Sequence, residues 1–456
     1  MIVGSFSTVV LAVTAAAGWW AYGEVGKTPG ELMDYAERRL QGHNKLEWVA
    51  LPALAQVRAV LDQPSSKTLL QIPFEVPPLP PLAKEPNRAD VAANLSAPPG
   101  FSGRVLRVGP FEDIRTIAKA AQLARNGDIV EIQSGEYRGD VASWPQKQLT
   151  IRTIGGRVRL LADGKSAEGK ATWVLRNGDF HIDNIEFVGS HVADLNGAGI
   201  RFEGGALTIT RCLFYGNDNG LLTTGTAASL SVSDSEFAYN GFGDGQSHSL
   251  YVGKVRDFKV TGSYFHHANV GHHIKSRAQR NLIAYNRITD ESGGRASYEI
   301  DLPNGGIATV LGNIVQQGAE PQNSALISYG AEGLAWPENR LYLASNTLVN
   351  DQSYGGTFVR TAPGTQRLIS ANNLFVGPGK WFDGPVSVES HNDQRATWAD
   401  FEKAARYDYR LTAMAQDKLI YAAPPVSELV PRKQFTQFGG QDALSGPPRY
   451  AGALPR

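Results

Sequence analysis

The tripeptide Ile185-Glu186-Phe187 is the first of a series of short segments that recurs through the middle of the chain. Its later members are CLF at 212–214, SEF at 235–237, SYF at 263–265, NRI at 286–288, NIV at 313–315, NTL at 346–348 and NLF at 373–375. Successive segments lie 23 to 33 residues apart, the length of one coil in a solenoid whose repeats bury their apolar side against their neighbours. Apolar residues alternate with a period of two, which favours strands over helices. The pattern predicts an all-β fold, a right-handed parallel β-helix.

Four of these segments begin with an asparagine, and most are followed by Gly or Asn. The residues after each segment suit sharp corners, because Gly and Asn adopt positive φ at small cost. We interpret the leading asparagines as turn amides that stack from coil to coil and not as ligands. They are Asn286, Asn313, Asn346 and Asn373.

Composition and local pattern divide the chain into five parts. Residues 1–24 are predicted to be a signal peptide or membrane anchor, and residues 28–63 a helical hairpin. Residues 64–104 are rich in proline and are predicted to be an extended linker. The β-helix is predicted over residues 105–415, and a C-terminal tail over residues 416–456.

The N-terminal segment Ile2–Tyr22 carries no charge and is mostly apolar, and about 20 such residues suffice to cross a bilayer as a helix. Ala15-Ala16-Ala17 would suit cleavage of a signal peptide, whereas Trp19-Trp20-Ala21-Tyr22 would suit the interfacial belt of a retained anchor. Either interpretation places the rest of the chain in the periplasm or cell envelope, secreted or attached to the inner membrane.

The charge balance argues against a nucleic-acid partner. The chain has 44 basic and 44 acidic residues, and it lacks the basic stripe interleaved with aromatic residues that follows a phosphate backbone. Its single cysteine, Cys212, excludes an intramolecular disulfide and is interpreted as a buried small hydrophobe. We expect a monomer.

A second strand of each coil becomes unusually polar in the middle of the chain. We align four such strands on the apolar residue of each that we expect to point inward. These residues are Leu250, Ile274, Ile300 and Ile327, and the aligned segments are HSLYVG, HHIKSR, YEIDLP and ALISYG. Neighbours of an inward residue point outward, and successive coils lie about 4.8 Å apart, so two outward rows are predicted. The first row holds Ser249, His273, Glu299 and Leu326; the second holds Tyr251, Lys275, Asp301 and Ser328, with Arg277 on the same face. The alternative is a solvated charged surface with a Lys275–Asp301 pair.

A predicted helix precedes the first coil. Its apolar face consists of Ile114, Ile117, Ala118, Ala121 and Leu123, and it is followed by the turn Asn126-Gly127-Asp128 and the strand Ile129–Ile132. This opening, the coil repeats and the polar row resemble the pectate-lyase-like superfamily, including alginate-lyase and chondroitinase-like polysaccharide lyases. The resemblance covers residues 105–411. It implies a helix that caps the solenoid and a closing strand at Tyr407–Leu411.

Lyases of that kind cut acidic, uronate-containing polysaccharides by β-elimination. The resemblance implies that Lys275 is the base, that Arg277 neutralises the substrate carboxylate, and that Tyr251 or His273 is the acid. Substrate-binding roles are predicted for Glu299, Asp301, His248, His272 and Ser328, although the two histidines also suit hydrogen-bonded corners. Some relatives use Ca²⁺, and Glu299 and Asp301 are the carboxylates that could hold it here.

Three alternatives to a lyase stay open. Glu299 and Asp301 would lie about 6.5 to 7 Å apart on one strand face, within reach of an inverting hydrolase pair, but the adjacent aspartates and Gly-His-Gly turn of polygalacturonase-like enzymes are absent. Epimerisation at C5 shares the proton removal of a lyase, but the DPHD-like signature of alginate epimerases is absent. The third alternative is a non-catalytic envelope protein that binds an exopolysaccharide.

Overall fold

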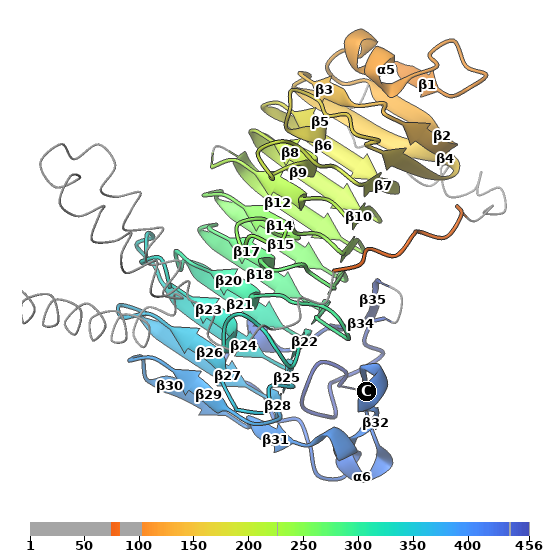
Figure 1. Cartoon of the computed structure of the whole chain (residues 1–456). Coiled ribbons are helices and arrows are strands. Elements are labelled where there is room, and N and C mark those ends of the chain that lie inside the picture. Colours follow the sequence, from red (N-terminus) through yellow and green to blue (C-terminus); the bar gives the residue numbers. More distant parts are fainter. Residues whose placement is uncertain (1–73, 83–102, 226, 437–438, 456) are drawn as a thin grey trace, which may run out of the picture. The chain divides into compact units, whose positions relative to one another are not determined.

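The computed structural model describes residues 74–82, 103–225, 227–436 and 439–455 (Figure 1). The chain divides into two units, residues 1–75 and 76–456, and the second unit contains the solenoid. The predicted N-terminal segment at 1–24 and the predicted hairpin at 28–63 lie outside the described residues. Among the residues that are described, no helix combines the length and apolar content that a membrane crossing requires.

The second unit is a parallel β-helix built from three ladders of strands, so the predicted fold class is confirmed. Strands β2 (Ile129–Arg138) and β4 (Gln148–Leu161) are long enough to start both of the first two ladders. Ladder 1 continues through β6 (Gly178–Asp183), β9 (Gly205–Thr210), β12 (Ala227–Ser233), β15 (Asp257–Thr261), β18 (Arg280–Ala284), β21 (Ile307–Leu311), β24 (Arg340–Ala344), β27 (Arg367–Ala371) and β30 (Val388–His391).

Ladder 2 contains the recurring segments and confirms their predicted register. It continues through β7 (Ile185–Val188), β10 (Leu213–Tyr215), β13 (Glu236–Ala238), β16 (Tyr264–His266), β19 (Arg287–Thr289), β22 (Ile314–Gln317), β25 (Thr347–Asn350), β28 (Leu374–Val376) and β31 (Gln394–Ala396). Phe214 pairs with Phe187 on one side and with Phe237 on the other, and Phe237 pairs with Phe265. The rings of these four residues stack in the core with centroids 5.2, 4.6 and 4.6 Å apart.

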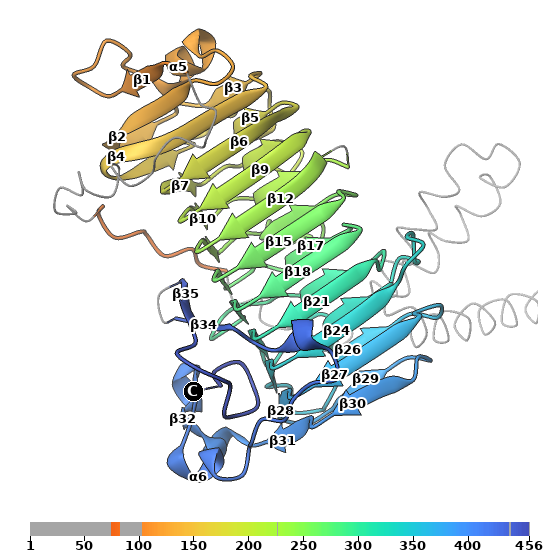
Figure 2. The same cartoon turned by 180° about the vertical axis from the view of Figure 1, so that it is seen from behind.

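Ladder 3 carries the polar strands. It runs through β3 (Ala142–Trp144), β5 (Ala171–Leu175), β8 (Ala198–Phe202), β11 (Asn219–Thr223), β14 (Leu250–Val252), β17 (His272–Ser276), β20 (Tyr298–Leu302), β23 (Ala325–Tyr329), β26 (Thr357–Thr361) and β29 (Lys380–Asp383). The strands of one coil differ in direction, and each side of the solenoid is a stack of parallel strands from successive coils (Figure 2).

A short helix covers the first coil, as the sequence predicts. Helix α5 (Ile117–Leu123) packs beside β3 and β1 (Val105–Val108), and β1 pairs in parallel with β2. The Asp140 carboxylate accepts hydrogen bonds from the first two helical amides, those of Ile117 and Ala118, at 2.6 and 2.9 Å. The buried residues of the helix are Ile117, Ala120 and Ala121, whereas Leu123, which we predicted on the apolar face, is exposed at the helix end.

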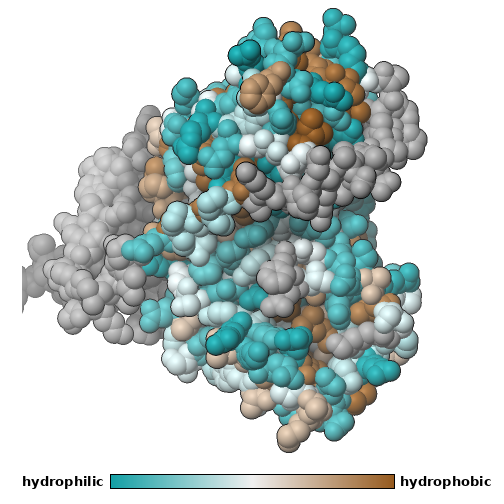
Figure 3. Space-filling model, turned by 90° about the vertical axis from the view of Figure 1, so that its right-hand side faces the viewer, coloured by the Kyte–Doolittle hydropathy of each residue, from teal (hydrophilic) through white to brown (hydrophobic). Residues whose placement is uncertain are grey.

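The last solenoid strand, β31, ends at Ala396, and the C-terminal segment then packs on the outside of ladder 2. It contains β32 (Phe401–Lys403), β33 (Asp408–Leu411), α6 (Ala413–Gln416), β34 (Lys433–Phe435) and β35 (Gln441–Ala443), and three 3-10 turns at 398–400, 404–406 and 427–429. Strand β33 contains most of the predicted closing strand, but it pairs antiparallel with β32 and not with a solenoid strand. Seen from this side, hydrophobic groups gather toward the upper and lower ends of a largely hydrophilic surface (Figure 3).

Residues 74–82 of the proline-rich segment form no helix or strand, and residues 76–82 belong to the same unit as the solenoid. The Tyr215 hydroxyl donates a hydrogen bond to the Pro77 carbonyl at 2.6 Å. Leu79 packs against a small buried cluster that contains Leu213, Tyr215 and Ala238. Residues 76–82 are therefore attached to ladder 2 rather than free of it.

Candidate functional site

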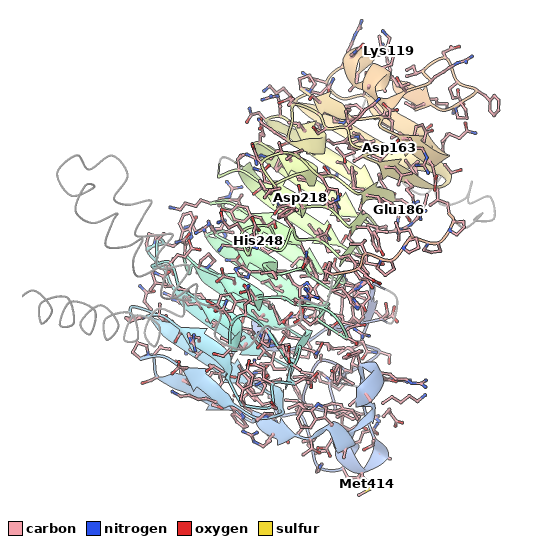
Figure 4. All side chains as sticks on the ribbon, viewed as in Figure 1. Lys119, Asp163, Glu186, Asp218, His248 and Met414 are labelled. Carbon is pink, nitrogen blue, oxygen red and sulfur yellow. The ribbon has the colours of Figure 1, made fainter. Side chains whose placement is uncertain are left out.

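The middle strands of ladder 3 have the register that the sequence predicts. Ile274 pairs with Leu250 and Ile300, and Ile300 pairs with Ile327. In the neighbouring row, Lys275 pairs with Tyr251 on one side and Asp301 on the other, and Asp301 pairs with Ser328. His248, which precedes β14, marks this region midway along the solenoid (Figure 4).

A cluster of charged side chains forms around Lys275; we call it the Lys275 cluster. Its members are Tyr251, Lys275, Arg277, Asp301 and Glu332. The Lys275 ammonium lies 2.8 Å from one oxygen of Glu332 and 3.3 Å from Asp301. Arg277 places a guanidinium nitrogen 2.7 Å from the other oxygen of Glu332 and donates from Nε to the Tyr251 hydroxyl at 3.0 Å.

Glu332 is a member of the cluster that the sequence did not indicate. It lies in a loop after β23 that folds back over ladder 3. The Glu332 amide donates to the Pro303 carbonyl at 3.0 Å, and the Trp336 indole donates to the Arg277 carbonyl at 3.2 Å. The interval between Val315 and Leu348 is the longest between recurring segments. This extra length contains the loop, and it was the sequence signal that could have indicated an additional loop here.

The charged groups of the Lys275 cluster form ion pairs with one another, and these pairs shift their pKa values. Burial acts to lower the pKa of Lys275, but Asp301 and Glu332 outweigh it and raise that pKa above its ordinary value. Burial acts to raise the pKa of Glu332, but Lys275 and Arg277 hold it below the usual range. Burial raises the pKa of Asp301 even though Lys275 opposes the shift. The Lys275 side chain is only 12 % exposed and that of Glu332 is 36 % exposed, so Glu332 is the more accessible member of the pair.

A hollow of about 510 Å³ lies beside the cluster, over β8, β11 and β14. Tyr251 and Arg277 line it together with Arg201 and Lys254, and no Asp or Glu is among its described lining residues. Neither Arg201 nor Lys254 forms an ion pair within the described residues. The hollow is therefore positively charged, which favours an anionic ligand.

The two predicted substrate-binding histidines form a buried stack. The rings of His248 and His272 are 4.6 Å apart, and the His272 ring also packs against Tyr298 at 5.1 Å. The Nδ1 atom of His248 accepts a hydrogen bond from the His272 amide at 3.1 Å, and the Nδ1 atom of His272 accepts one from the Tyr298 amide at 3.3 Å. Burial lowers both pKa values well below the ordinary histidine value, so both rings are neutral with the proton on Nε2.

The prediction that the first row faces outward is wrong. Ser249, His273, Glu299 and Leu326 are all fully buried. His273 packs edge-on against the core residue Phe265 with centroids 6.5 Å apart, while the next residue, Ile274, is also in the core. Strict alternation fails along the whole row, since Leu326 and Ile327 of β23 are likewise both in the core.

Burial corrects the predicted site assignments of three residues. His273 and Glu299 are enclosed and cannot reach a substrate on the outer face, and Ser328, although it belongs to the second row, is buried at 1 % exposure. Glu299 approaches His273, whereas Asp301 approaches Lys275 and His272. The Glu299–Asp301 pair that a calcium site or an inverting hydrolase would need is therefore not formed.

The fully buried Glu299 has a different set of neighbours, which includes Asp290. One oxygen of Glu299 lies 3.5 Å from His273 Nε2, and Asp290 lies 3.4 Å from the same nitrogen. Burial, together with Asp290, raises the pKa of Glu299 well above its ordinary value. Asp290 lies two residues after the recurring segment at 286–288, and nothing in its sequence position distinguished it from a turn residue.

No family model and no curated protein sequence matches this chain. Among solved structures, a pectate lyase, Pel9A, shares 14 % identity over 78 % of this chain and 97 % of its own, with a TM-score of 0.47. The PL6 family polysaccharide lyase Pedsa3628 from Pseudopedobacter saltans shares 12 % identity over 72 % of this chain and 98 % of its own, with a TM-score of 0.30. The Dettilon tailspike protein gp208 shares 13 % identity over 62 % of this chain and 68 % of its own, with a TM-score of 0.27.

These similarities are low in sequence and concern the fold. The three ladders and the capping helix carry the assignment by themselves. The solenoid of this chain is a parallel β-helix.

Proposed function

We propose that the outer face of β14, β17 and β20 binds an acidic polysaccharide and cleaves it by β-elimination. The observation that carries the proposal is the position of Glu332. Its two carboxylate oxygens lie 2.8 Å from Lys275 and 2.7 Å from Arg277, so these two cations are spaced to hold one carboxylate. A uronate carboxylate that displaced Glu332 would find the same two charge-assisted contacts.

The adjoining hollow supports a polymeric anion as the ligand. Arg201 and Lys254 extend the positive charge of Arg277 along the solenoid toward β8. A linear polyanion that lies across successive coils would contact these cations one after another, and attraction of this kind also speeds encounter at low salt.

The chemistry of the proposed reaction divides among three side chains. Lys275 and Arg277 neutralise the carboxylate and make the neighbouring C5 proton more acidic. Tyr251, whose hydroxyl accepts a hydrogen bond from Arg277 at 3.0 Å, is assigned as the group that takes the proton from C5 and passes a proton to O4. The electron pair of the C5–H bond forms the C4–C5 double bond, the C4–O4 bond breaks, and O4 receives the proton that Tyr251 took from C5. Lys275 is held as a cation by two carboxylates, so we assign it to neutralisation and not to the role of base.

Non-catalytic binding is the second candidate, and the enclosure of Lys275 favours it. The Lys275 side chain is 12 % exposed and is already paired with Asp301 and Glu332. If the loop that carries Glu332 stays in place, the hollow would hold a polyanion without bringing it to Lys275. Such binding in the hollow would suffice for an exopolysaccharide-binding protein of the cell envelope. That protein would be attached or exported through the N-terminal segment 1–24.

The test uses the full chain and a panel of uronate polymers, with ultraviolet absorbance to follow unsaturated chain ends. We expect absorbance to rise with one polymer, and Tyr251→Phe to slow the rise about 10²- to 10⁴-fold, the usual contribution of a proton-transfer group. Arg277→Met should weaken binding as well. Arg280→Met, on ladder 1 and paired with the exposed Asp257, is the control and should change neither.

Three other outcomes are informative. Binding that is lost in Arg277→Met without any unsaturated product would favour the non-catalytic protein. Exchange of the C5 proton with solvent in an uncut polymer would indicate an epimerase. Absence of binding to every acidic polymer tested would overturn both candidates.

A further inference from the structure

We infer that His273, Asp290 and Glu299 form a buried site for one divalent transition-metal ion of the zinc class. The three residues come from β17, from the position after β19 and from β20. One donor atom from each, an imidazole nitrogen and two carboxylate oxygens, lies within 4.8 Å of the other two. The site is separate from the Lys275 cluster and does not depend on the proposed function.

The unpaired donor atoms point to a cation. His273 and Glu299 are 0 % exposed. Within the described residues, neither nitrogen of His273 and neither carboxylate oxygen of Glu299 has a hydrogen-bond partner. Buried polar groups are nearly always paired, because leaving them unpaired destabilises the fold. A metal ion between these side chains would satisfy one donor atom of each.

Two of the three distances between donor atoms fit tetrahedral coordination. His273 Nε2 lies 3.4 Å from an Asp290 oxygen and 3.5 Å from a Glu299 oxygen. Ligand atoms in a tetrahedral zinc site with bonds of about 2.0–2.2 Å lie about 3.3–3.6 Å apart. The donor set of one imidazole and two carboxylates suits zinc and its neighbours, whereas Ca²⁺ requires six to eight oxygens.

Asp290 is held in position for this role. Its Oδ1 atom accepts a hydrogen bond from the Ala296 amide at 2.8 Å, and its Oδ2 atom accepts one from the Gly318 amide at 3.3 Å. Hydrogen bonds of this kind orient metal ligands. Because the site is closed, the ion would link two neighbouring coils and the loop after β19, which is a structural role.

The first test is metal analysis of the full chain, purified without a histidine tag. We expect about one equivalent of a zinc-class metal by mass spectrometry. Removal of the metal by a strong chelator should lower the Tm, and Zn²⁺ but not Mg²⁺ should restore it. Co²⁺ should restore it too and give the visible absorption of a tetrahedral complex. Substoichiometric metal, with no change in Tm on addition of Zn²⁺, Co²⁺ or Mn²⁺, would overturn the inference.

The second test assigns the ligands. Glu299→Gln keeps the size of the side chain and should lower the metal content at least tenfold. Asp301→Asn, two residues along the same strand but facing Lys275, is the matched control and should retain the metal. Full metal content in Glu299→Gln would exclude this site. If that variant does not fold, the analysis of the unaltered chain decides the matter.

Discussion

At the scale of single residues, the corner asparagines of ladder 2 form a continuous line of hydrogen bonds. Each side-chain oxygen accepts from both the amide nitrogen and the side-chain nitrogen of the asparagine one coil earlier, at 2.9 to 3.0 Å, from Asn286 through Asn313 and Asn346 to Asn373. Each side-chain nitrogen also donates to a backbone carbonyl, as Asn313 does to Ile283 at 2.8 Å. The line confirms the prediction of stacked turn amides, and it satisfies backbone amides that the corners leave buried.

Removing one amide from this line should destabilise the solenoid. Asn313→Ala leaves the buried Asn286 amide without its acceptor, and an unsatisfied buried group of this kind costs about 1–3 kcal/mol. We expect the free energy of unfolding in urea to fall by at least that amount. Asn196→Ala, at an exposed position, is the control. Equal stability of the two variants would contradict the role given to the line.

At the scale of elements, the turn between α5 and β2 is held by a single carboxylate. Asp128 accepts hydrogen bonds from the amides of Arg104 and Arg125 at 3.1 and 2.8 Å, and it pairs with the Arg104 guanidinium at 2.7 Å. Burial acts to raise the pKa of Asp128, but these contacts outweigh it and lower the pKa below its ordinary value. The carboxylate thereby connects the capping helix to the first coil.

This pKa shift predicts acid sensitivity at the capped end. The folded pKa of Asp128 lies below its unfolded value of about 3.9, so the contribution to stability is present above that pH and is lost as the pH falls through the folded pKa. In urea unfolding between pH 7 and pH 3, Asp128→Asn should be less stable at neutral pH and should lose less stability in acid than the unaltered chain. The exposed Asp163→Asn is the control, and equal acid slopes for Asp128→Asn and the unaltered chain would refute the assignment.

At the scale of the whole second unit, the C-terminal segment covers the outer face of ladder 2. Val349, Leu374 and Val376 point away from the solenoid core and pack in a separate cluster with residues of that segment. The covering residues include Phe401, Tyr409, Leu411, Phe435, Ala451 and Ala453. Ladder 2 therefore has two apolar faces, one inside the coils and one under the segment, and the predicted tail is part of the folded structure.

Removing this cover should expose an apolar surface. A chain that ends at Ala396 should have a lower Tm, bind a hydrophobic dye and be cut faster by protease, because burial of each large apolar side chain in the cluster contributes about 1.5–3 kcal/mol. Met414→Ser, at a site 83 % exposed in the same segment (Figure 4), should match the unaltered chain. A truncated chain with unchanged Tm and dye binding would show that the cover is dispensable.

The sequence by itself determined the solenoid, the register of ladders 2 and 3 and the adjacency of Tyr251, Lys275 and Asp301. These are consequences of a repeated apolar pattern, since each coil can bury its inward residues only against matching residues of the next coil. Within a strand the period of two also placed Lys275 and Arg277 on the outer face.

Only the tertiary structure decided which residues around the strand ends face inward and what covers the outer face. Two successive residues of β17, His273 and Ile274, both face inward, so His273 lies beside Asp290 and Glu299 and not on the outer face. The loop that brings Glu332 to Lys275 is anchored by contacts to Pro303 and Arg277. Periodicity describes neighbours along one strand, whereas corners and returning loops depend on contacts between distant parts of the chain.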